Sequence, residues 1–140
     1  RPWSDVHLWT HLALVPAILG AVAHGLLELA VLQFGVLALS VVYHRGHEVR
    51  GTRLAVVEGS SAKVLFLYGL AQTFGNRPSS SPLLFLGELV CIVAILVAFV
   101  ATNMNAADHE TYDRWHPWGM HVVPGIWSCF VAFYHTCLVF

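Results

Sequence analysis

Long apolar runs separated by short polar segments dominate this chain of 140 residues. A helix needs about 20 predominantly apolar residues to cross the hydrocarbon core of a bilayer. The first run, residues 8–43, is too long for a single crossing, so we expect a helical hairpin with its turn at His24-Gly25. This predicts one membrane span over residues 8–23 and a second over residues 26–44.

Three further spans follow from the remaining apolar runs, over residues 54–74, 83–103 and 115–140. The segment 75–82 is rich in glycine, proline and serine, which predicts a loop. Pro82 suits the first turn of the fourth helix, because a missing backbone N–H costs nothing there. A polar connection over residues 105–114 precedes the fifth span, in which Pro124-Gly125 should produce a kink.

The predicted fold class is therefore all-α: a polytopic transmembrane bundle of about five spans that forms one domain, 1–140. The apolar runs exceed strand length and show no alternation, which argues against strands. The chain is 57% hydrophobic and 11% charged, whereas soluble domains carry about a quarter charged residues. Its net charge of −1 leaves no basic face for nucleic acid. We expect membrane lipids and membrane-protein partners around it.

Basic residues predict the orientation of the bundle, because cytoplasmic loops carry an excess of arginine and lysine. Five crossings put the N-terminus and two loops on one side, with Arg1, Arg45, Arg50, Arg53 and Arg114, and leave Arg77 on the other. We place the N-terminus on that positive side, which would be cytoplasmic, or matrix or stromal in an organelle such as the mitochondrion. An aromatic belt is expected there from Trp3, Trp9, Trp115 and Trp118, with His7, His11 and His109 at the interface.

Polar side chains inside the apolar runs mark the candidate site. Ser40 and His44 lie near the end of the second span, Glu58 near the start of the third and His121 near the start of the fifth. The expected topology brings all four to one depth beneath the positive face. Polar groups are retained in hydrocarbon mainly where they pair, coordinate or line a cavity.

Zinc is the metal that this set of side chains would suit. Neutral imidazoles bind zinc, and three protein ligands plus water make an open catalytic site. His44 and His121 could supply two ligands, with His47, His116 or Glu58 as the third. The same residues can also be explained as helix-end groups that reach lipid headgroups or bond neighbouring helices.

Two other intramembrane features have competing explanations. Lys63, near the middle of the third span, should pair with Glu28, Glu58 or Glu88, more readily as a structural ion pair than as a proton relay. His24 and His135 lie towards the far side and could hold a haem between facing helices, although no spacing selects them.

Three short motifs resemble the CREST superfamily of seven-helix membrane proteins, which includes alkaline ceramidases and adiponectin-type receptors. Ser40-Val-Val-Tyr-His44 is similar to the Ser-x-x-x-His of their second helix. Glu58-Gly59-Ser60-Ser61 is similar to the third helix of the branch that holds myomaker and the GPI-processing phospholipase relatives, with Glu in place of Asp. Asp113-Arg114, followed by an aromatic and glycine-containing stretch and Pro124, is similar to the fifth helix of that branch.

The resemblance implies a zinc ion on His44 with Ser40 and Glu58 beside it. The remaining ligands of the family come from His-x-x-x-His on a seventh helix. The last predicted span here carries His116 and His121 five residues apart, and a single further histidine, His135. The ligand set that the resemblance implies is thus incomplete on that helix.

Two functions from different classes follow as hypotheses. The first, which the incomplete ligand set and the short loops favour, is a non-catalytic accessory subunit packed against partners in a larger membrane complex. The second is a zinc-dependent hydrolase of a lipid ester or amide. In the second, His44, His121 and His116 are the expected metal ligands, while Ser40 and Glu58 would position water or stabilise charge.

Overall fold

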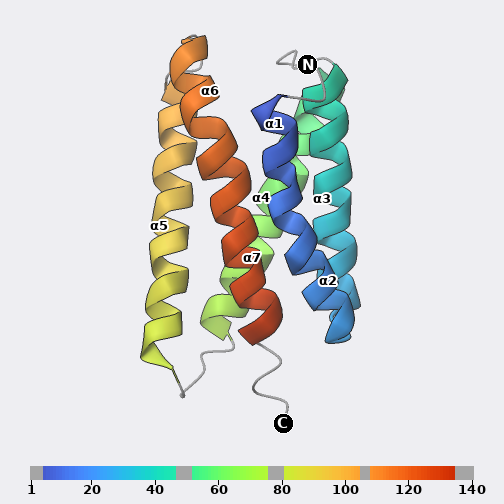
Figure 1. Ribbon diagram of the computed structural model, residues 1–140, viewed down its shortest axis with the longest axis vertical. Helices are drawn as coiled ribbons and strands as arrows, with labels where there is room; N and C mark the ends of the chain where they lie inside the picture. Colours follow the sequence, from blue (N-terminus) through green and yellow to red (C-terminus); the bar gives the residue numbers. More distant parts are fainter. Residues whose placement is uncertain (1–4, 47–51, 76–80, 105–107, 135–140) are drawn as a thin grey trace.

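A computed structural model describes residues 5–46, 52–75, 81–104 and 108–134 of the chain. These residues form helices and no strand, which confirms the all-α prediction for the described part. The helical segments form five long rods, some made of several consecutive segments, and these rods lie side by side along the length of the molecule (Figure 1). The described start of the chain and the end of α3 lie at one end of this bundle, and the described C-terminal end lies at the other.

The first rod is composite, and it leads into the predicted hairpin. It consists of α1 (Val6–Trp9), the 3-10 segment η1 (Thr10–Leu14) and α2 (Val15–Ala23), and α3 (Leu27–Gly46) follows. Gly25 makes the turn with a φ of 74°, a conformation that glycine adopts without steric penalty. The backbone N–H of Leu26 closes the turn on the carbonyl of Ala21 at 2.8 Å.

The third and fourth rods lie within one residue of their predicted bounds. They are α4 (Arg53–Gly75) and α5 (Pro82–Met104). Pro82 is the first residue of α5, as predicted, because the proline ring fixes φ near its helical value.

The last rod begins earlier than the sequence analysis expected. It consists of α6 (His109–Pro117), the π-helical turn η2 (Trp118–Val122) and α7 (Val123–Tyr134). The predicted polar connection is therefore wrong over residues 109–114. Asp108 starts the helix, because its carboxylate accepts hydrogen bonds from the backbone of Glu110 at 3.1 Å and the hydroxyl of Thr111 at 2.5 Å, which is N-capping.

Four helical stretches are long and apolar enough to cross a membrane: Val6–Ala23, Leu27–Gly46, Arg53–Gly75 and Pro82–Met104. Large apolar side chains cover their outward faces, and Val31 and Leu83 are 72% and 78% exposed. Exposed apolar surface on this scale is unfavourable in water and suits lipid. The chain is thus a multi-helix protein of membrane-spanning character.

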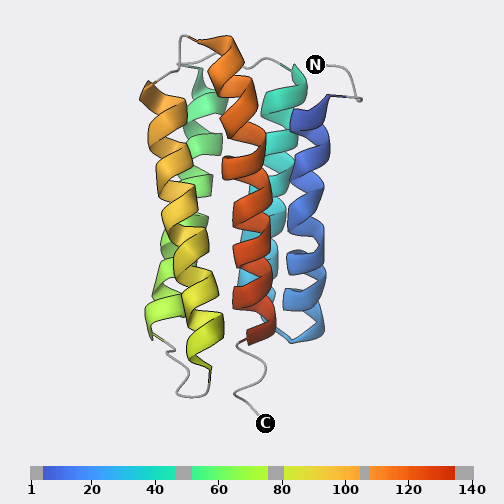
Figure 2. The ribbon, with the colours of Figure 1, turned by 60° about the vertical axis from the view of Figure 1, so that its left-hand side comes forward.

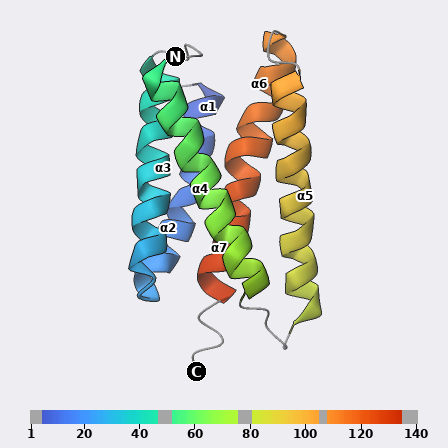
Figure 3. The same ribbon diagram turned by 180° about the vertical axis from the view of Figure 1, so that it is seen from behind.

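The last rod is the centre of the bundle. It lies between α5 and the first rod (Figure 2), and α4 crosses on the opposite side of it (Figure 3). Trp127 and Val131 of α7 form the buried core with residues of three other helices, including Ala21, Leu29 and Ile92. The first half of the last rod packs against α1 and η1.

Candidate metal centre

Five histidine side chains converge at the end of the bundle where the described chain begins. They come from three rods: His7 and His11 from the first, His44 from α3, and His116 and His121 from the last. Four of them are buried, with exposed fractions of 1% to 6% for His7, His11, His44 and His121. His116 is half-buried and lies on the outer side of the group.

Three of these histidines are close enough to share one ion. The ligand atoms of His11, His44 and His121 all lie within 4.8 Å of one another. Zinc-bound nitrogens lie about 2.0–2.1 Å from the metal, which places two of them about 3.3–3.4 Å apart in a tetrahedral site. Each ring therefore needs to move inward by less than about 1 Å to coordinate a zinc ion.

The backbone fixes the proton position on His11. Its Nδ1 makes a short hydrogen bond with the carbonyl oxygen of His7. A carbonyl can only accept, so Nδ1 carries the proton and Nε2 keeps its lone pair. That Nε2 atom is buried and has no hydrogen-bond partner among the described residues. A metal-ligating imidazole usually has this arrangement, with its other nitrogen bonded to a carbonyl or carboxylate.

The hydroxyl group of Thr10 fixes the proton position on His121. Thr10 Oγ1 lies 2.8 Å from Nδ1 of His121 and 3.0 and 3.1 Å from the carbonyl oxygens of Val6 and His7. The hydroxyl proton goes to one of these carbonyls, so the oxygen accepts from the Nδ1–H of His121. The Nε2 of His121 is then free to bind a metal ion.

His116 provides a further nitrogen beside this group. Its Nε2 lies 3.4 Å from Nε2 of His44, and its ring centroid lies 4.9 Å from that of His121. The nitrogen separation is that of two ligands on one tetrahedral ion. The structure thus brings together His44, His116 and His121, and adds His11 to them.

The π-helical turn explains how two histidines five residues apart face the same group. In an α-helix, residues five apart point about 140° away from each other. In η2 the backbone N–H of Val123 bonds to the carbonyl of Trp118, an i→i−5 bond that widens the turn. Such turns are frequent at functional sites. Pro124 follows directly and lacks the N–H that an α-helical bond to Met120 would require.

A short hydrogen bond lies one helical turn from His44. Ser40 Oγ donates to Oε1 of Glu58 at 2.5 Å, which joins α3 to α4. Ser40 is buried and Glu58 is half-buried. Ser40 and His44 are four residues apart on one helix, so they share a face.

His7 and His11, which the sequence analysis placed at the membrane interface, have side chains buried within the group. His7 lies between two carboxylates, with Nδ1 3.1 Å from Asp5 and Nε2 3.4 Å from Asp113. The signal that would have found both residues is their spacing: together they form His-x-x-x-His, which places two imidazoles on one helix face.

Other expected partners are not brought together. No ion pair joins Lys63 to Glu28, Glu58 or Glu88, all of which lie in the described part of the chain, and Lys63 is exposed on α4. His24 is exposed and contacts the ring of Phe133 edge-on. His47 and His135 lie outside the described residues, as do Arg1, Arg50 and Trp3.

No protein family matches the chain, and no curated protein or solved structure is significantly similar to it. What can be said of its activity therefore rests on the three buried imidazoles of His11, His44 and His121 and on the groups around them.

Proposed function

We propose that this chain is a zinc-dependent membrane hydrolase that cleaves an ester or amide bond of a lipid. The observation that supports this most is the convergence of His11, His44 and His121, each on a different rod, with ligand atoms within 4.8 Å of one another. Burying several imidazoles in an apolar bundle is unfavourable unless they coordinate or bond. One tetrahedral ion would satisfy them together.

The neighbouring carboxylate suits hydrolysis. A zinc ion held here would supply Lewis-acid polarisation of a carbonyl and activation of water. Glu58, whose Oε1 accepts from Ser40 at 2.5 Å, has a second oxygen that can take a proton from water and return it to the leaving group. Ser40 holds the carboxylate in place. His116, the least buried of the five converging histidines, would be the fourth ligand or lie beside the entering substrate.

The membrane setting supports a lipid substrate. In our proposal the last rod, His109–Tyr134, is a fifth span, and the metal centre lies just beneath the arginine-rich face, cytoplasmic or its organellar equivalent. A bond near a lipid headgroup would reach that depth from the adjacent leaflet. The similarity of Ser40, His44 and Glu58 to the CREST motifs is consistent with hydrolysis of a lipid amide or ester.

An accessory subunit is the second candidate, and one observation favours it. Lys63 is exposed near the middle of α4, about 15 Å from the start of the helix and about 18 Å from its end at 1.5 Å per residue. An ammonium group facing lipid at that depth is unfavourable by several kcal/mol. A partner helix with a carboxylate at the same depth would neutralise it, and the protein would then act within a larger complex.

Metal analysis of the purified protein tests the first candidate. We expect about one zinc per chain, lost in His44→Ala and in His11→Ala and kept in His24→Ala, the control histidine at the far end. Hydrolysis of a panel of lipid esters and amides should be lost together with the metal.

The results separate the two candidates. Wild-type protein that binds no metal when supplied with zinc would exclude the hydrolase. A metal-free protein that co-purifies in fixed ratio with a membrane protein, with the association lost in Lys63→Leu, would establish the accessory subunit.

A further inference from the structure

A pocket lies at the opposite end of the bundle from the metal centre. Its volume is about 320 Å³, and its walls come from the turn between α2 and α3, the first residues of α3, and Tyr68 of α4. Glu28 in this pocket is 16 residues from His44, or about 24 Å along the α3 axis. The pocket is thus separate from the proposed catalytic site and does not depend on it.

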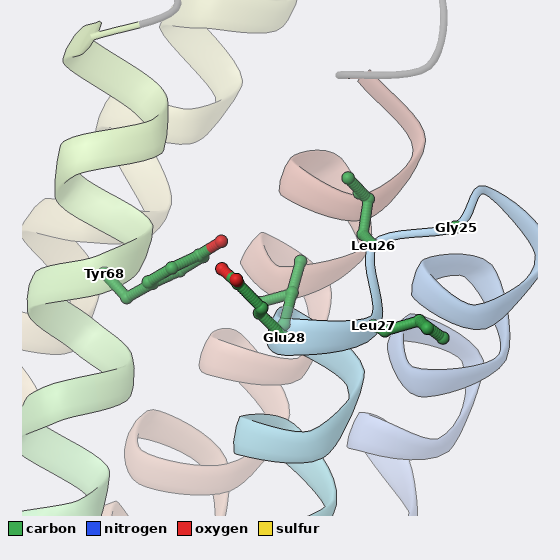
Figure 4. A pocket seen from close by; sticks show the side chains of 6 residues that line it. Gly25, Leu26, Leu27, Glu28 and Tyr68 are labelled. Atoms are coloured by element: carbon green, nitrogen blue, oxygen red, sulfur yellow. The ribbon is translucent and has the colours of Figure 1, made fainter.

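Two polar groups face each other in this pocket. Figure 4 shows the Glu28 carboxylate and the Tyr68 hydroxyl directed towards the same space from α3 and α4. The remaining walls come from Gly25, Leu26, Leu27 and Leu29. A carboxylate and an aromatic ring above apolar walls form the environment in which proteins bind organic ammonium groups.

The Glu28 carboxylate is exposed, and no cation of the described residues pairs with it. Lys63, the basic residue that the sequence analysis expected as a partner, makes no ion pair with Glu28. The position of Glu28 in the first turn of α3 does stabilise that helix end. That interaction does not require a pocket, a tyrosine directed into it, or leucine side chains around it.

We infer that this pocket binds the ammonium group of a membrane-lipid headgroup in the leaflet opposite the metal centre. The level of the pocket supports a lipid as the occupant, because α2 ends and α3 begins there and the ends of membrane-spanning helices lie at headgroup depth. Choline or ethanolamine would place its ammonium between Glu28 and the ring of Tyr68. Leu26 would contact the methyl groups, and the exposed Leu27 would contact the acyl chain outside the pocket. An anionic headgroup without an ammonium would be repelled by Glu28.

Native mass spectrometry of the protein from nanodiscs tests this binding. With equal parts phosphatidylcholine and phosphatidylglycerol, we expect wild type to retain one phosphatidylcholine in preference. Glu28→Gln should weaken that retention about tenfold, and Tyr68→Leu several-fold, whereas Tyr68→Phe keeps the ring and should retain the lipid. The control is Glu110→Gln, which removes an 85% exposed carboxylate at the other end of the bundle and should change nothing.

Three results of these experiments would overturn the inference. Equal retention of the two lipids, or unchanged retention in Glu28→Gln, would show that the pocket does not select ammonium groups. Displacement of the lipid by millimolar choline chloride would assign the pocket to a soluble amine. If Glu28→Gln does not fold, the comparison of Tyr68→Leu with Tyr68→Phe decides. The same protein stripped of metal by a chelator should bind equally well, so this result is independent of the hydrolase test.

Discussion

Thr10 Oγ1 lies 2.8 Å from Nδ1 of His121, although the two residues are 111 positions apart in the chain. Both side chains are buried. This hydrogen bond ties the first rod to the last and sets which nitrogen of His121 is available to a metal ion. Thr10 would therefore not bind the metal itself, but its hydroxyl would orient the His121 ligand.

Thr10→Val should therefore weaken metal binding without removing a ligand. Valine has nearly the shape of threonine but leaves Nδ1 of His121 without a partner, and loss of such an outer contact weakens metal affinity about 10–100-fold. Thr10→Ser keeps the hydroxyl and should bind zinc nearly as wild type does. Titration against a competing chelator measures both. Equal affinity of the valine variant would mean that His121 does not bind through Nε2.

Ser40→Ala and Glu58→Gln should separate catalysis from metal binding. In our proposal these residues handle protons and water, and removal of a general base lowers the rate about 10²–10⁴-fold. Metal content should stay near one ion per chain in both variants, as metal analysis of the assayed samples would show. Loss of the metal in Glu58→Gln would instead identify Glu58 as a ligand.

His116→Ala tests whether the centre has an open position. With His11, His44 and His121 as the ligands, the variant should keep its zinc and lose at most about tenfold in affinity. Loss of the ion comparable to that in His44→Ala would show a closed site of four histidines, which is typical of structural rather than catalytic zinc. Metal content and X-ray absorption of the bound zinc distinguish the two.

Gln33→Leu should stabilise the bundle. Gln33 is fully buried on α3, and its amide nitrogen and oxygen have no hydrogen-bond partner within the described chain. An unpaired buried amide is unfavourable by about 1–3 kcal/mol, so the free energy of unfolding should rise by that amount. Unfolding by dodecyl sulfate in mixed micelles measures the change, with the half-buried Gln72→Leu as control. A destabilised variant would indicate that a water molecule or ligand bonds this amide.

Gly125→Ala should disturb both stability and the metal centre. A Cβ atom at Gly125 would lie 2.6 Å from the carbonyl oxygen of Ala13, a backbone atom that cannot move aside without shifting η1. Overpacking of this kind is unfavourable by about 1–3 kcal/mol, and the first rod would move away from His121. Gly35→Ala is the matched control, because no atom lies within 4 Å of its added Cβ. Unfolding and zinc content should change only in the first variant.

The positions of the spans followed from the sequence because each is bounded by a strong local signal. Apolar runs of membrane length set α4 and α5, and Gly25 set the hairpin. The common depth of Ser40 and Glu58 followed from topology alone. The early start of the last rod was also signalled, by the capping side chain of Asp108, but the polarity of the next residues outweighed that signal.

The full set of five converging histidines could not be predicted from the sequence, for two physical reasons. His7 and His11 lie at the start of a span, where an imidazole can reach water, so hydropathy gives no reason to bury them. His116 and His121 were expected as ligands, but they are five apart, a spacing that a regular helix would place on different faces. The tertiary arrangement shows that these four histidines meet together with His44.

The π-helical turn at Trp118–Val122 holds one residue more than an α-helical turn would. Deleting one residue between His116 and His121 would leave the two imidazoles aligned in ordinary helical geometry, at the His-x-x-x-His interval. Because the widened turn accommodates the extra residue, side chains beyond the deletion would keep their present neighbours. A variant that lacks one residue of this turn should therefore keep both the histidine pair and the core-facing residues of α7 in register.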